Sequence, residues 1–130
     1  MISIDQILYE TFTNDSALMA LLPGSVHSTW STEGEYPRLI FDASMTSLNN
    51  EIQGGSLTID VFGKGNNKVI LEAIRTRVEY LLESQFFATD ETGPTLRFWK
   101  RNHDTVPDDS PQIIHLIIQY DIRAARIRPS

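Results

Sequence analysis

The chain has 130 residues, of which 41% are hydrophobic and 22% charged, so it is long enough for one domain with its own core. It contains no cysteine, which excludes disulfides, thiolate metal sites and cysteine nucleophiles. Its net charge of −6 argues against a protein that grips nucleic acid over its whole surface. No apolar run approaches the ~18–20 residues of a membrane span, and the first ten residues lack the basic start of a secretory signal. We therefore expect no membrane partner.

The first segment of the chain has its apolar residues at helical spacing. Apolar residues recur at positions 4, 7, 8 and 12, behind Ser3 as a candidate N-cap. Asp15 is placed to cap a short second helix, which Pro23 and Gly24 end. We expect both helical segments to share one apolar side.

Three strands are predicted next, over residues 26–30, 38–43 and 56–62. The third has the clearest alternation, with Leu57, Ile59 and Val61 on one face. Between the last two strands, residues 45–55 are polar apart from three isolated apolar side chains and contain two adjacent glycines. Such a segment has little to bury on its own, so we expect an extended loop or a hairpin arm there.

The longest helix is predicted over 67–83, behind Asn66 or Asn67 as its cap. Glu72, Arg75 and Glu79 lie off its apolar stripe and are favourable helix neighbours. Strands over 95–102 and 113–124 follow. The outward side of the last strand is apolar at its start, which indicates that something covers it there.

These elements predict an α+β fold in the order α-β-β-β-α-β-β. Short connections favour antiparallel neighbours, and a helix with one apolar stripe packs on a sheet. We expect a single domain over 1–130, with one mixed, mainly antiparallel sheet of about five strands and two main helices on one face.

Motifs for chemistry are missing from the sequence. The three histidines, His27, His103 and His115, are not at metal-ligand spacing. No nucleophile elbow occurs, and the turn 63–67 lacks the patterns of phosphate-binding loops. We therefore predict no catalytic residue, no cofactor and no metal, and we expect that the protein is not an enzyme.

Candidate interface residues come from three parts of the chain. Aromatic residues bracket the loop 31–35, apolar residues punctuate the arm at 45–55, and arginines crowd a basic tail at 123–130. The tail contains three arginines, and without them the rest of the chain has a net charge of −9. The basic tail therefore either stays solvated or docks on an acidic neighbour, which includes another copy of the chain. Trp99 is expected to pack in the core. The candidate interface residues are Trp30, Tyr36, Met45, Leu48, Ile52, Arg123, Arg126 and Arg128.

The order and spacing of several segments resemble the tail completion, or tail terminator, proteins of long-tailed bacteriophages, also called tail-to-head joining proteins. After the opening helix come NDSALMALL at 14–22, EYPRLIF at 35–41 and LTIDVFG at 57–63. The amphipathic helix follows, and Asp104 is then expected in a loop ahead of the long final strand.

The resemblance implies a structural role in the virion, with assembly in the bacterial host cytoplasm. Members of this family form a ring, typically a hexamer, at the head-proximal end of the tail. The implied partners are other copies of the chain, the tail tube protein and the head-connector or neck protein. Phage DNA passes through the ring without specific binding. The alternatives are another neck component, such as a head-closure protein, and a small ligand-binding or enzymatic α+β domain.

Overall fold

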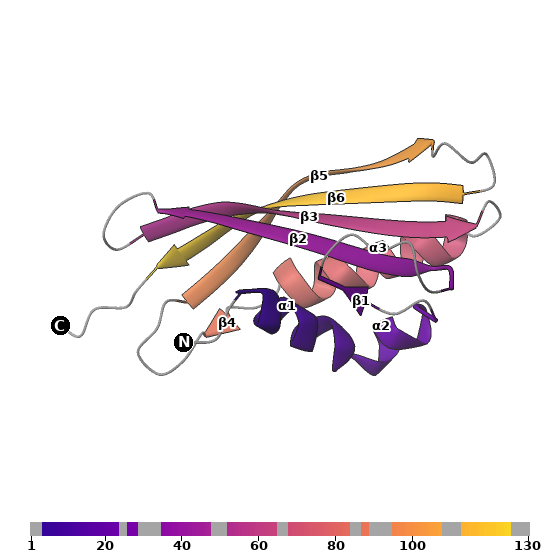
Figure 1. Cartoon of the computed structure of the whole chain (residues 1–130), viewed down its shortest axis with the longest axis horizontal. Coiled ribbons are helices and arrows are strands. Elements are labelled where there is room, and N and C mark those ends of the chain that lie inside the picture. Colours follow the sequence, from indigo (N-terminus) through magenta and orange to yellow (C-terminus); the bar gives the residue numbers. More distant parts are fainter. Residues whose placement is uncertain are drawn as a thin grey trace.

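The computed structural model describes residues 4–23, 26–28, 35–47, 52–64, 68–83, 87–88, 95–107 and 113–125. A six-stranded sheet lies on one side of the molecule, and the helices lie on the other (Figure 1). The elements in chain order are α1 (Ile4–Thr13), α2 (Ser16–Ala20), β1 (Val26–His27), β2 (Arg38–Ser47), β3 (Ile52–Lys64), α3 (Lys68–Glu83), β4 (Phe87–Ala88), β5 (Thr95–Pro107) and β6 (Ile113–Ala125).

The strand order in the sheet is β1-β2-β3-β6-β5-β4. β1 pairs with β2 in parallel, and the other pairs are antiparallel. The predicted α+β class and the mixed, mainly antiparallel sheet are therefore confirmed. The additional strand is β4, whose two residues are too few to show an alternation in the sequence.

The helical start follows the prediction. Asp15 is the N-cap of α2, because its side chain accepts a hydrogen bond from the Leu18 amide at 2.9 Å. The predicted caps Ser3, Asn66 and Asn67 lie outside the described residues.

The core lies between the sheet and the three helices. Phe12 of α1 meets Phe41 of β2 edge to face, with ring centroids 5.7 Å apart. Each large apolar side chain buried here contributes about 1.5–3 kcal/mol to the free energy of unfolding. The fully buried members, at 0% exposure, include Leu8, Phe12, Leu18, Leu39, Phe41, Leu57, Ile59, Val61, Ile74, Val78, Leu82 and Ile118.

The segment 45–55 extends β2 and β3 at both of its ends. Met45 pairs with Gly55, and Ser47 pairs with Gln53, while residues 48–51 lie outside the described residues. Of the two expected forms, the antiparallel pairing of these ends is that of a hairpin arm and not of an extended loop. The backbone supplies the ladder hydrogen bonds whatever the side chains are, and β6 pairs with the whole length of β3, from Ile52↔Ala125 onward.

β5 is also longer than predicted, because it runs through Asp104 to Pro107. The expectation of Asp104 in a loop is wrong, since this residue pairs with Ile117 of β6. A register shift between Lys100 and Asn102 reverses which side chains point outward. The alternation in the sequence is broken at that point, so the pattern ended the strand too early.

Candidate interaction surfaces

The open face of the sheet carries a cluster of arginines around one tryptophan. Trp99 is 43% exposed, and the Arg97 guanidinium lies 4.9 Å from the centroid of its ring. Arg123 pairs directly with Arg97 across the strands, and Arg101 Nε lies 3.6 Å from Asp121 Oδ1. We call these five residues the arginine–tryptophan patch.

The prediction that Trp99 packs in the core is wrong. Its neighbours Leu96 and Phe98 are buried, and the alternation of β5 turns Trp99 to the face that the helices do not cover. Like charges directly opposite each other, as at Arg97 and Arg123, are unfavourable within a sheet. The patch thus combines basic charge with exposed aromatic area, which is the composition of many protein–protein contacts.

A second cluster lies at the opposite end of the open face, around Arg38. The Arg38 side chain is buried, at 6% exposure. Its guanidinium lies 4.6 Å from the centroid of the Tyr36 ring. Nearby, the His115 ring stacks on Phe62 at 4.3 Å, and its Nε2 lies 2.6 Å from Asp60 Oδ1. This cluster fixes Tyr36, a predicted interface residue, against the sheet.

On the helix side, a groove of about 510 Å³ runs between α2 and α3. Its apolar lining includes the small residues Ala17 and Ala73 and the larger Leu21. Tyr80, which also lines it, is 58% exposed. We call this surface the α2–α3 groove. Its full lining is Ala17, Leu21, Glu72, Ala73, Thr76, Arg77 and Tyr80.

An ion pair holds the two walls of the α2–α3 groove together. Arg77 of α3 donates from Nε to Asp15 Oδ2 at 2.8 Å and from Nη2 to Asp15 Oδ1 at 2.7 Å. The hydrogen bond from Arg77 lowers the pKa of Asp15, and the Leu18 amide lowers it further. Arg77 also lies over Tyr80, 4.7 Å from the ring centroid. This bidentate ion pair between Arg77 and Asp15 therefore fixes the position of α2 against α3.

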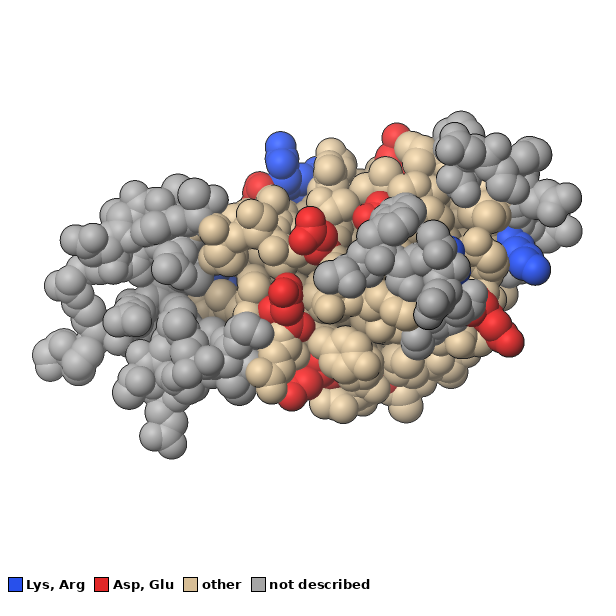
Figure 2. Space-filling view, in the orientation of Figure 1, with Lys and Arg blue, Asp and Glu red and all other residues tan. Residues whose placement is uncertain are grey.

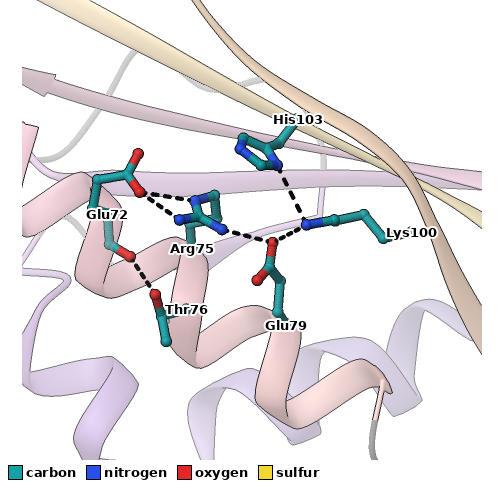
Figure 3. Close-up of polar contacts among 6 residues, drawn as sticks. All are labelled: Glu72, Arg75, Thr76, Glu79, Lys100 and His103. Carbon is teal, nitrogen blue, oxygen red and sulfur yellow. Dashed lines mark hydrogen bonds and ion pairs between the residues drawn. The ribbon is translucent and has the colours of Figure 1, made fainter.

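A second polar network ties α3 to β5 (Figure 3). Arg75 donates to Glu72 from Nε at 3.0 Å and to Glu79 from Nη1 at 2.9 Å, which confirms the predicted helix neighbours. Lys100 of β5 donates to Glu79 at 2.6 Å, and His103 lies beside Lys100. Burial alone would raise the pKa of Glu79, but the hydrogen bonds from Lys100 and Arg75 outweigh it and lower that pKa.

The predicted interface residues occupy different places. Arg123 lies in the arginine–tryptophan patch, and Tyr36 lies in the cluster at the other end. Met45 is partly buried and packs against the core, and Ile52 begins β3, paired with Ala125. Trp30, Leu48, Arg126 and Arg128 lie outside the described residues, as does the side chain of Ile52.

Within the described residues, no group of three or more histidine, aspartate or glutamate side chains is placed to hold a metal ion. No described helix is both long enough and apolar enough to cross a membrane.

Comparison with known proteins finds similarity among solved structures. No family model matches the chain, and no curated protein matches it. Among solved structures, a chain of the virion of a native gene transfer agent particle is similar, with a TM-score of 0.76 and 11% sequence identity. The similarity covers 95% of this chain and 95% of that one. The two chains therefore share a fold over nearly all of their length.

Proposed function

We propose that this protein is a structural component of a phage-like particle. The observation that carries the proposal is the shared fold, over 95% of both chains, with a protein of a gene transfer agent virion. The surfaces described above support it, because they combine exposed aromatic, apolar and charged side chains as contact surfaces do.

Within such a particle, we assign the protein to a ring at the head-proximal end of the tail. There it ends polymerisation of the tail tube and joins the tail to the head connector. The segments at 14–22, 35–41 and 57–63 support this assignment through their resemblance to tail completion proteins. The role needs no catalysis and no cofactor.

The acidic charge fits a channel for DNA. Six copies at −6 each carry −36 in total. A negative lining repels phosphates, and this repulsion reaches about 10 Å at moderate salt. DNA then passes through the ring without adhering to it. The −6 of the whole chain supports this part of the proposal.

Deleting the gene in the phage or prophage that carries it tests the assignment. Loss of a tail terminator gives tubes of irregular and excessive length that do not join heads, and a plasmid copy restores normal tails. Loss of a head-closure protein instead gives tails of regular length beside filled heads that leak DNA, which would move the protein to the neck. Normal virions after the deletion would contradict a structural role in the particle.

A further inference from the structure

Two of the surfaces described above lie on opposite sides of the molecule. The arginine–tryptophan patch is on the open face of the sheet, and the α2–α3 groove is in the helix layer that covers the other face (Figure 1). Because they face apart, one molecule cannot bring its own patch into its own groove. Each surface is available only to another molecule.

The arginine–tryptophan patch and the helix layer differ in the sign of their exposed charge. The arginine–tryptophan patch contains three arginines and one aspartate, all exposed. On the face drawn in Figure 2, red acidic side chains lie in the middle and also at the upper edge, and the most prominent blue side chains project from the upper and right margins. The exposed charged residues on α1, α2 and α3 are the acids Asp5, Glu10, Glu72 and Glu83 and the base Lys68, while Arg77 is partly exposed and paired with Asp15. The opposite signs are complementary.

Shape and polarity agree with the charge. Trp99 offers a large aromatic side chain, 43% exposed, at the centre of the arginine–tryptophan patch. The α2–α3 groove offers about 510 Å³ beside small side chains, of which Ala17 and Ala73 are themselves exposed. An aromatic residue that enters an apolar pocket, surrounded by polar contacts, is the usual centre of a strong protein contact.

We infer that the arginine–tryptophan patch of one copy docks on the α2–α3 groove of the next copy, with Trp99 entering the groove. The inference rests on the proposed function and names the surfaces that build the ring. A contact between two different surfaces is heterologous, so each copy binds one neighbour on each side. Such a chain of copies closes into a ring when the rotation between neighbours divides a full turn.

The absence of native cysteine allows a direct test by disulfide cross-linking. We would make Asp121→Cys, at the position paired directly with Trp99, and Ala73→Cys in separate copies, so that Trp99 itself is kept. The two variants would be mixed where the wild-type protein assembles, and the mixture oxidised. The expected product is a cross-linked pair that contains one copy of each variant. A chain with both substitutions is expected to give a ladder of oligomers that ends at the size of the closed ring.

Matched controls separate this contact from random collision. Asp121→Cys mixed with Tyr9→Cys replaces the exposed groove position 73 with another exposed helix position, 47% exposed on α1, and is expected to cross-link far less. Asp121→Cys alone should give no dimer, since two copies of the arginine–tryptophan patch repel each other. A strong dimer of Asp121→Cys alone would overturn the inference in favour of a symmetric contact.

A blocking variant tests the same contact without cross-linking. Ala73→Trp fills the α2–α3 groove from an exposed helix position, and Trp99→Ser removes the entering side chain. Each should weaken association of copies by about 30-fold or more, as expected for the centre of an interface. Far-ultraviolet circular dichroism shows whether each variant keeps the wild-type fold.

The remaining outcomes separate the two proposals. If the wild-type protein forms rings but cysteines at positions 73 and 121 of neighbouring copies do not cross-link, this inference is overturned and the proposed function stands. A protein that forms no oligomer, in solution or in particles, would overturn both. If Arg123→Glu and Arg101→Glu abolish binding to duplex DNA while rings persist, the arginine–tryptophan patch contacts nucleic acid and the inference is wrong.

Discussion

The carboxylate of Asp15 both caps α2 and links α2 to α3. Its Oδ2 accepts from the Leu18 amide and so caps α2, while both oxygens accept from Arg77 of α3. Replacing Asp15 with alanine removes both interactions, and the cap alone contributes about 1 kcal/mol to the free energy of unfolding. We expect Asp15→Ala to lower the urea midpoint. Asp15→Asn, which keeps an acceptor for the amide but loses the charge, should lower it less.

The pH dependence of the same variants isolates the ion pair. The hydrogen bond from Arg77 lowers the pKa of Asp15 in the folded state below its ordinary value of 3.8. The stabilisation from this charge is therefore fully present above pH 3.8 and is lost as the pH falls through the folded-state pKa. The difference in stability between wild type and Asp15→Asn should be present at neutral pH and narrow below 3.8. A difference that stays constant across that range would contradict the role of the charge.

At the scale of elements, the pairing between the end of β2 and the start of β3 depends on Gly55. A Cβ added at Gly55 would lie 2.1 Å from the Ser44 carbonyl oxygen, which is a backbone atom and cannot move without disturbing the strand pair. Gly55→Ala should lower the free energy of unfolding by about 1–3 kcal/mol. It should also speed hydrogen exchange in the amides of β2 and β3 near Ser44.

Gly63→Ala is the matched control for that substitution. Its added Cβ would meet the Leu71 side chain at 3.0 Å, and a side chain can shift where a backbone carbonyl cannot. We expect Gly63→Ala to cost less stability and to leave hydrogen exchange near Ser44 unchanged. Equal losses in the two variants would mean that the close approach at Gly55 has no special weight.

The elements that sequence reasoning predicted well are those with an uninterrupted period. The stripe of α3 and the alternation of β6 gave bounds within a residue of the observed Lys68–Glu83 and Ile113–Ala125. The second half of β5 was missed because the register shift after Lys100 changes the phase of the alternation. The ends of β2 and β3 were missed because backbone pairing with β6, rather than side-chain burial, extends them.

At the scale of the whole molecule, the candidate surfaces were only partly predictable. Arg123 stood out as part of a basic tail, but its neighbour Arg97 lies far away in the sequence and meets it only through the pairing of β5 with β6. The exposure of Trp99 was not predicted, because the sequence does not show that the helices leave its face of the sheet uncovered. The α2–α3 groove left no signal in the sequence, since a groove arises from how two helices pack.

If opposite charges bring copies together, salt must weaken their association. Raising the ionic strength from about 0.1 M to about 1 M shortens the screening length from about 10 Å to about 3 Å, which reduces attraction between exposed charges. We expect the oligomeric fraction, measured by sedimentation at fixed protein concentration, to fall as sodium chloride is raised. An association held by apolar contact alone would not weaken in this way.

Neutral variants locate that salt dependence on one surface. Arg101→Gln with Arg123→Gln removes two of the three arginine charges of the arginine–tryptophan patch but keeps Trp99, so association should be weaker at low salt and nearly independent of salt. Lys64→Gln removes an exposed charge at the opposite end of the sheet and should behave as wild type. If the double variant kept the full salt dependence of the wild type, the attraction between copies would have to come from charges elsewhere on the molecule.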